Sequence, residues 1–418
     1  MKYDVVITNG TLFLSYGEMK NKDIGVKDGY IIAVEEGIEK AEANLIIDAT
    51  DKVIVPGFVD AHIHMDKAFT ADEDDCVCLL DASNRSRQEL CAYYQGWNRE
   101  SIIVDMTENM ERILQQCIVN GTSAVRTNIA VNSVMGTAGL EAVNRLKKKY
   151  ERKIDILVTA DCPVGMEAEW EHAVECGWID FIGGYPNLKE DEKNHSICYD
   201  SQKLQNARRI FALAKKYKMP IDLHCDETDE ADFSLFRDIC EQTWRQQMGG
   251  EVTVSHVTAL DAKGADEEAV ADAIAWCAKS GVYVTTLTGQ NLYLMSENRR
   301  GTTRVRQLKE AGVCVSVASD NVRDTFCPFG NFDLIEEALL TAQVHKFGTE
   351  RELLDVMNMI TYFPAASCKL QDYGLLPGCK ANLVILDGDS VPETLRSQVK
   401  KKYVIHLGKI VAQDGRIV

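Results

Sequence analysis

The stretch Val53-Ile-Val-Pro-Gly-Phe-Val-Asp-Ala-His-Ile-His-Met65 joins two kinds of sequence and carries two histidines near its end. It begins as an apolar run, turns at Pro56-Gly57 and continues as an alternating strand. Because side chains two apart in a strand share a face, His62 and His64 are expected to point the same way. Two neutral imidazoles on one strand can supply half of a mononuclear metal site. The pair alone is a modest signal, since one hydrogen-bonded inward histidine and one solvent-facing histidine would give the same sequence.

Strand-like segments separated by tight-turn signals precede this stretch. A hairpin is predicted around Asn9-Gly10, with strands on either side of that turn, and a second one around Asp28-Gly29. Segments of the same style return near the other end of the chain, at 382–387, 402–407 and 408–412. We therefore expect residues 1–55 and 366–418 to pair into one small β-sandwich domain beside the intervening sequence.

Helix-like segments alternate with short apolar strands between these two ends. The first strand carries His62, and seven more are predicted at 124–129, 154–160, 181–185, 219–224, 251–256, 282–287 and 313–320. Helices are predicted at 106–119, 139–150, 168–176, 203–217, 266–278 and 303–311. Eight such units over ~300 residues predict an α/β fold with a (β/α)8 TIM barrel, here over residues 56–365. Functional side chains in this fold lie at the carboxyl ends of the strands.

The charge balance and hydropathy of the chain argue against several classes of protein. The net charge of −18, from 64 acidic and 46 basic residues, disfavours binding to a phosphate backbone, so no nucleic-acid partner is expected. No apolar run approaches the ~18 residues of a membrane span, and the first residues lack the apolar core of a signal peptide. The 14 cysteines are scattered and include no CxxC pair. A reduced, cytoplasmic protein with a small-molecule partner is the simplest interpretation.

Four potential metal ligands lie at predicted strand ends. His62, His64, His224 and Asp320 would bring three nitrogens and one oxygen to a common point above the barrel. Such a set leaves a position open for water, as catalytic rather than structural metal sites do. A bound divalent ion lowers the pKa of its water to roughly 7, which makes hydroxide available at neutral pH.

Two further groups follow strand ends, and each has a plain structural alternative. Glu227 comes three residues after His224 and is predicted to carry a proton to the substrate, although it could be a solvated loop acid. His256 could ligate the metal, or polarise the substrate oxygen and stabilise a tetrahedral intermediate, or be a core histidine. Asp320 is also expected to take the proton from the metal-bound water.

The motifs around these residues resemble the amidohydrolase superfamily, and within it the cytosine deaminase branch. The resemblance to the superfamily rests on Pro56-Gly-Phe-Val-Asp-Ala-His-Ile-His64, on the β-rich ends and on Gly374-Leu-Leu-Pro-Gly-Cys-Lys-Ala-Asn-Leu-Val-Ile-Leu-Asp387. The resemblance to the branch rests on His62-Ile-His-Met-Asp-Lys67, Val125-Arg-Thr127, His224-Cys-Asp-Glu-Thr-Asp229, Val254-Ser-His256, Arg299-Arg-Gly-Thr-Thr-Arg-Val305 and Ser319-Asp320. It implies one Zn2+ or Fe2+ and hydrolytic attack on a ring C–N bond. It further implies Glu227 as proton shuttle, His256 as polarising residue and Asp320 as ligand and base, in a family that often forms homo-oligomers.

Three positions depart from the cytosine deaminase pattern. Where those enzymes carry Phe-Pro-Gln-Glu-Gly, this chain has Cys162-Pro-Val-Gly165, so Val164 replaces a glutamine amide that would read the pyrimidine edge. Asn321 stands where a second aspartate is usual, and Asn128 replaces the histidine of Val-Arg-Thr-His. Loss of a hydrogen-bonding partner reduces discrimination by about one to a few kcal/mol. We expect these three residues to bind the substrate, and that substrate to differ from cytosine.

The sequence therefore predicts a metal-dependent hydrolase, and within that class a deaminase of a small nitrogen heterocycle. An alternative on the same scaffold is a hydrolase of a cyclic amide or of an N-alkylamine. The site residues do not separate these reactions, because both pass through a tetrahedral intermediate. A metal-binding relative without catalysis is a third interpretation, which the presence of Glu227, His256 and Asp320 disfavours.

Overall fold

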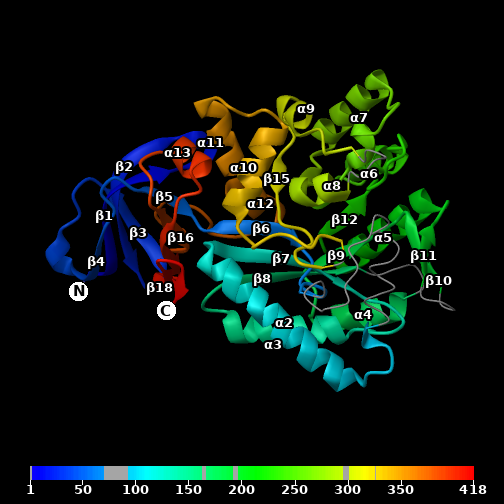
Figure 1. Ribbon diagram of the computed structural model, residues 1–418, viewed down its shortest axis with the longest axis horizontal. Coiled ribbons are helices and arrows are strands. Elements are labelled where there is room, and N and C mark those ends of the chain that lie inside the picture. Colours follow the sequence, from blue (N-terminus) through cyan, green and yellow to red (C-terminus); the bar gives the residue numbers. More distant parts are fainter. Residues whose placement is uncertain (1, 70–92, 162–165, 192–195, 295–300, 325) are drawn as a thin grey trace.

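The computed structural model describes residues 2–69, 93–161, 166–191, 196–294, 301–324 and 326–418. Val164 and the rest of Cys162–Gly165 lie outside these residues, as do Arg299 and Arg300 of the predicted motifs. Figure 1 shows a barrel surrounded by helices and, beside it, a sheet built from both ends of the chain. No helix in the described part of the chain is long and apolar enough to cross a membrane.

Eight parallel strands form the barrel, in sequence order around it. They are β6 (Phe58–Ile63), β7 (Thr122–Ala130), β8 (Asp155–Asp161), β9 (Phe181–Gly184), β12 (Ile221–Cys225), β13 (Val252–His256), β14 (Tyr283–Thr286) and β15 (Val315–Val317). The first and last strands meet where the Asp320 N–H donates to the His62 carbonyl at 2.9 Å and the His64 N–H donates to the Asp320 carbonyl at 3.2 Å. The eight predicted strands and the barrel are confirmed, and the seam that closes the barrel brings three predicted ligands together.

Helices α2 to α12 follow the barrel strands, and α13 lies in the C-terminal segment (Figure 1). Their bounds are α2 (Arg99–Val119), α3 (Ala138–Tyr150), α4 (Glu167–Glu175), α5 (Lys203–Tyr217), α6 (Ser234–Arg245), α7 (Glu267–Ser280), α8 (Thr288–Leu294), α9 (Val305–Glu310), α10 (Leu334–Val344), α11 (Glu350–Asn358), α12 (Tyr362–Ser367) and α13 (Val391–Arg396). The helix predicted from residue 106 begins earlier, at Arg99, because the Asn98 side chain accepts the Ser101 N–H at 3.0 Å and caps it. An antiparallel pair, β10 (Leu188–Asp191) and β11 (Ser196–Tyr199), is inserted between β9 and α5.

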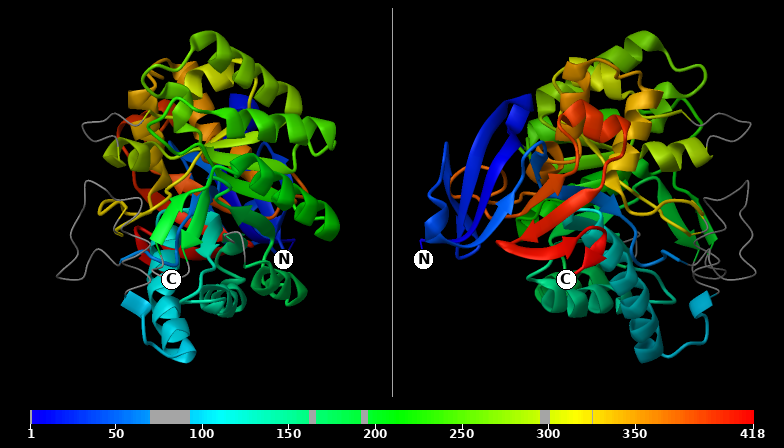
Figure 2. Two further views of the ribbon diagram at one scale, coloured as in Figure 1. Left: turned by 90° about the vertical axis from the view of Figure 1, so that its right-hand side faces the viewer. Right: turned by 60° about the vertical axis from the view of Figure 1, so that its left-hand side comes forward.

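Both ends of the chain share one nine-stranded sheet (Figures 1 and 2). Its strands are β1 (Tyr3–Phe13), β2 (Met19–Lys27), β3 (Tyr30–Glu35), β4 (Ala43–Asp48), β5 (Val53–Pro56), β16 (Leu383–Leu386), β17 (Lys401–His406), β18 (Lys409–Gln413) and β19 (Arg416–Ile417). Strand β5 connects the two halves, since it pairs with β1 on one side and with β16 on the other. The predicted pairing of the two chain ends is confirmed.

The apolar run at the start of the opening stretch is explained by burial on both faces of β5. Val53 and Val55 pack into the core that fills the barrel and its helices, whereas Ile54 packs into a second core on the far face of the sheet. Gly57 then separates this strand from β6. A Cβ atom at Gly57 would lie 2.4 Å from the Ser123 Cβ, so only glycine allows the sheet and barrel to approach here.

The hairpin predicted at Asn9-Gly10 is wrong. Strand β1 continues through these residues, with a shift in its register against β2 between Ile7 and Gly10. A side chain at Gly10 would collide with Ile54, whose Cδ1 would lie 2.4 Å from the added Cβ. The Asn-Gly pair therefore forms a bulge beside β5 rather than a turn. The turn at Asp28-Gly29 joins β2 to β3 as predicted, with both residues at positive φ.

Candidate metal centre and active site

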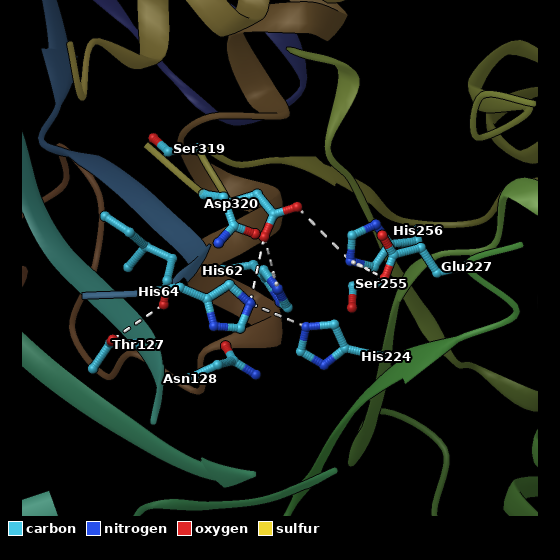
Figure 3. Close-up of polar contacts among 12 residues, drawn as sticks. His62, His64, Thr127, Asn128, His224, Glu227, Ser255, His256, Ser319 and Asp320 are labelled. Carbon is cyan, nitrogen blue, oxygen red and sulfur yellow. Dashed lines mark hydrogen bonds and ion pairs between the residues drawn. The ribbon is translucent and has the colours of Figure 1, made fainter. Parts of the chain in front are cut away.

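The predicted site residues converge at the carboxyl ends of four barrel strands (Figure 3). His62 lies in β6 and His64 directly follows it, His224 lies in β12, and His256 is the last residue of β13. Asp320 comes three residues after β15, where the barrel closes. These five residues are buried, with at most 2% of any residue exposed.

Short distances join the four predicted ligands. His64 Nε2 lies 3.1 Å from His224 Nε2 and 3.4 Å from Asp320 Oδ1. His62 Nε2 lies 3.6 Å from the same carboxylate oxygen. Two groups, one of His62, His64 and Asp320 and one of His62, His224 and His256, each offer ligand atoms within 4.8 Å of one another. The spacing suits a single ion bound by several of these side chains.

The buried polar atoms at this point fit a divalent cation. Within the described part of the chain, neither ring nitrogen of His62 and neither carboxylate oxygen of Asp320 has a hydrogen-bond partner. Buried groups of this kind are nearly always paired, so their convergence calls for a ligand. Burial lowers the pKa of His62 well below its usual value, and repulsion from His256 adds to this, so the ring is neutral and able to ligate. Burial raises the pKa of Asp320, and the nearby charge of Glu227 raises it further. A bound cation would favour the ionised carboxylate and so lower this pKa again.

Glu227 and His256 lie beside the predicted ligands. His256 Nε2 is 3.7 Å from Glu227 Oε2 and 3.8 Å from Asp320 Oδ2. The Glu227 side chain is 20% exposed, so it reaches the solvent-facing side of the site without being a solvated loop acid. Its neighbour Asp226 anchors the loop, because the buried carboxylate accepts the Phe236 N–H at 2.8 Å.

Two of the three predicted substrate-binding residues are described, and each already uses its amide group within the protein. Asn128 is fully buried, and its Nδ2 donates to Asp161 at 3.4 Å and to Asp222 at 3.5 Å. Asn321 is buried as well, and its Nδ2 donates to Asp324. The Asn128 Oδ1 has no hydrogen-bond partner among the described residues, so it remains available as an acceptor.

Three residues that the sequence analysis missed contact the predicted ligands. The Tyr185 ring, directly after β9, stacks on the His224 ring with centroids 3.8 Å apart and planes 24° apart. Asp161, the last residue of β8, places Oδ1 4.0 Å from His224 Nδ1. Asn291 in α8 places Oδ1 3.3 Å from His256 Nδ1. A systematic search for polar and aromatic residues after every predicted strand would have found Asp161 and Tyr185.

Comparison with known proteins agrees with this geometry. Residues 183–412 match the amidohydrolase family. The chain is also 30% identical over 427 residues to N-isopropylammelide isopropyl amidohydrolase of Pseudomonas sp. strain ADP, covering 100% of this chain and 99% of that protein. The chain belongs to the amidohydrolase family. The predicted family is therefore confirmed, and with it the class of enzyme, a metal-dependent hydrolase of carbon–nitrogen bonds.

Two other proteins extend the comparison of this amidohydrolase. It is 26% identical over 415 residues to pterin deaminase of Rhizobium rhizogenes strain K84, covering 95% of this chain and 89% of that protein. The crystal structure of 5-methylcytosine deaminase from Klebsiella pneumoniae with 5-fluorocytosine superposes with a TM-score of 0.83 at 24% identity, covering 98% of this chain and 97% of that one. That structural likeness supports the (β/α)8 fold with its accessory sheet.

Proposed function

We propose that this amidohydrolase releases ammonia from a small nitrogen heterocycle. The observation that carries the proposal is the buried convergence of His62, His64, His224 and Asp320 with Glu227 and His256 beside them. The names of the relatives support it, because pterin, N-isopropylammelide and 5-methylcytosine are all nitrogen heterocycles with an exocyclic amine. The reaction would take place in the cytoplasm, a reducing compartment that suits the nine cysteines whose side chains are described, all of which are free thiols.

His62, His64, His224 and Asp320 would hold one divalent ion. Three imidazole nitrogens and one carboxylate oxygen suit Zn2+ and Fe2+ alike, so we propose one of these two. The bound ion would supply Lewis acidity and lower the pKa of a coordinated water to roughly 7.

The surrounding side chains would manage the protons. Asp320 would accept the proton of the attacking water, because its carboxylate lies at the centre of the cluster. Glu227 would deliver a proton to the leaving amine, since it alone of the cluster is partly exposed towards the substrate side. His256 would interact through Nε2 with the oxygen of the tetrahedral intermediate.

Asn128, Asn321 and Val164 remain our proposed substrate-binding positions. With its amide N–H groups engaged, Asn128 would accept a hydrogen bond from a ring N–H through Oδ1, which points towards the His64 ring in Figure 3. A valine at position 164 cannot bond to the pyrimidine edge, so we propose a substrate other than cytosine.

A second candidate reaction is release of an alkylamine from the same kind of ring. The observation that favours it is the 30% identity with N-isopropylammelide isopropyl amidohydrolase along the full chain. The leaving group decides between the two reactions, because the same side chains would serve both.

Ammonia release tests the proposal. We would assay pyrimidines, purines, triazines, pterins and creatinine for ammonia, with alkylamine release and metal content measured in parallel. We expect about one metal ion per chain and ammonia from at least one heterocycle; alkylamine release or ring opening without ammonia would favour the alternative. Glu227→Gln should abolish turnover, whereas Glu230→Gln, a matched change at an exposed acid of the same loop, should not. Unchanged turnover in Glu227→Gln would contradict the assigned role.

A further inference from the structure

We propose that Asn291 is a positioning residue that fixes the tautomer and the ring orientation of His256. This inference deepens the proposed function and rests on it for its kinetic part. Asn291 lies in α8, directly after the seventh barrel strand, and does not belong to the predicted set of ligands or acids.

The contact between the two residues is fully enclosed. Asn291 is 0% exposed and His256 2% exposed, and the Asn291 Oδ1 lies 3.3 Å from the His256 Nδ1. In this orientation of the Asn291 amide the oxygen faces the ring, and because an amide oxygen can only accept a hydrogen bond, the contact assigns the hydrogen to Nδ1. A neutral ring with hydrogen on Nδ1 carries its lone pair on Nε2. That nitrogen is the one that lies 3.7 Å from Glu227 and 3.8 Å from Asp320.

The backbone of Asn291 is fixed by helix α8 and by the packing of α8 on α10. The Asn291 N–H donates to the Leu287 carbonyl at 2.9 Å, and the Thr288 hydroxyl lies 2.8 Å from the Thr341 hydroxyl of α10. A Cβ added to Gly289 would lie 3.0 Å from both carboxylate oxygens of Glu337, so α10 packs directly against this turn. The backbone that carries the acceptor is therefore packed firmly against α10, and the Asn291 side chain is enclosed with 0% of the residue exposed.

The other partner is fixed independently. His256 ends β13 at a positive φ of 69°, and its carbonyl accepts the Thr303 hydroxyl at 2.6 Å. Because the backbone on both sides is held, the Asn291 contact decides how the ring is rotated and which nitrogen faces the centre. Partners of this type around a metal site typically contribute about 10–100-fold to metal affinity or activity.

The assigned tautomer narrows the roles available to His256. In its neutral form the ring has no N–H to donate at Nε2, so it enters the reaction there as a ligand or as a proton acceptor. It can donate to the substrate oxygen only after Nε2 has received a proton. The sequence left two roles for His256 open, that of a metal ligand and that of a polarising residue. With the tautomer that Asn291 fixes, His256 must first accept a proton at Nε2 before it can polarise the substrate oxygen.

Kinetics of three variants test the positioning role. Asn291→Leu has nearly the same size but cannot accept a hydrogen bond, and we expect kcat to fall by about 10–100-fold with KM changed less than about threefold. Asn291→Asp keeps an acceptor and should recover most of kcat. Asn358→Leu is the matched control, because it makes the same change at a fully buried asparagine of α11 whose amide donates to the Leu354 carbonyl, and it should stay within about threefold of the parent. An Asn291→Leu enzyme as active as the parent would overturn the proposal.

Nitrogen NMR of the metal-free full chain tests the tautomer without relying on activity. The protein would be labelled with 15N-histidine and measured about two pH units above the ordinary histidine pKa of 6.5, with the His256 signals identified by their loss in His256→Gln. We expect a protonated Nδ1 and an unprotonated Nε2, and a shift of the proton towards Nε2 in Asn291→Leu. An unprotonated Nδ1 in the parent protein would overturn the proposal even if the enzyme is active. If no heterocycle is turned over, the proposed function fails while this measurement still decides the tautomer.

Discussion

The ion pair between Arg126 and Asp222 beneath the proposed metal centre gives the sharpest prediction for stability. Both side chains are 0% exposed, and Arg126 Nη2 lies 3.0 Å from Asp222 Oδ1. The other Arg126 donors contact the carbonyls of Ala61 and Ser367 and the Thr253 hydroxyl, none of which carries a charge. Replacing Asp222 by leucine would leave a buried guanidinium without its counter-charge.

The expected cost follows from burial. Removing one partner of a fully buried ion pair costs about 3–5 kcal/mol, whereas replacing both partners by apolar residues is often neutral or stabilising. We therefore expect Asp222→Leu and Arg126→Met each to destabilise by about 4 kcal/mol, and the double variant to lose much less than the sum. Burial raises the pKa of Asp222 and the Arg126 charge lowers it, which is consistent with a carboxylate that depends on this partner.

Urea unfolding followed by tryptophan fluorescence would measure these changes as shifts in the midpoint at an unchanged slope. Lys149→Met is a suitable control, because its ion pair with Glu111 is at the surface and should contribute at most about 1 kcal/mol. A double variant that loses the full sum of the single effects would refute the ion-pair reasoning, and so would an Asp222→Leu variant that loses less than about 1 kcal/mol.

Three other measurements follow from named contacts. Removal of the metal by a chelator should abolish activity and lower the melting temperature, because a ligand that binds only the folded state stabilises it. Added Zn2+ or Fe2+ should restore both. A metal-free protein of unchanged activity would contradict the proposed metal site. Burial lowers the pKa of His406 to about 4. Below pH 6.5 the unfolded state therefore binds a proton at this histidine that the folded state does not bind. The free energy of unfolding should fall by up to about 3 kcal/mol between pH 6.5 and 4. In His406→Gln the free energy of unfolding should depend less steeply on pH in this range. An unchanged slope would contradict the role of His406. Tyr185→Leu removes the ring stacked on His224 and should weaken metal binding by about 3- to 10-fold in a chelator competition. Unchanged metal binding would show that the stack does not support this ligand.

The barrel and the convergence of the candidate ligands could be predicted because both depend on local patterns. Each barrel strand is a short apolar run, and each predicted ligand lies within three residues of a strand end. Parallel strands in a closed barrel place all their carboxyl ends on one side, so residues far apart in sequence were certain to meet. Asn9-Gly10 shows the opposite case, because β1 continues through the pair as a bulge, and Gly10 packs against Ile54, a residue 44 positions later in the sequence.

The recognition residues were harder to interpret for the same physical reason. A residue type at position 128 or 321 shows which hydrogen bonds are available, but not which of them the protein itself already uses. Asp161 and Asp222 accept the two Asn128 N–H groups, so that amide can offer a substrate only its oxygen, whereas Asp324 accepts one N–H group of Asn321. The Asn128 Oδ1 is an acceptor, so it selects a ring with an N–H group at its edge, whereas the histidine of the cytosine deaminase pattern can also donate a hydrogen bond. In the proposed function, the choice of substrate therefore depends on the contacts behind Asn128 as much as on Asn128 itself.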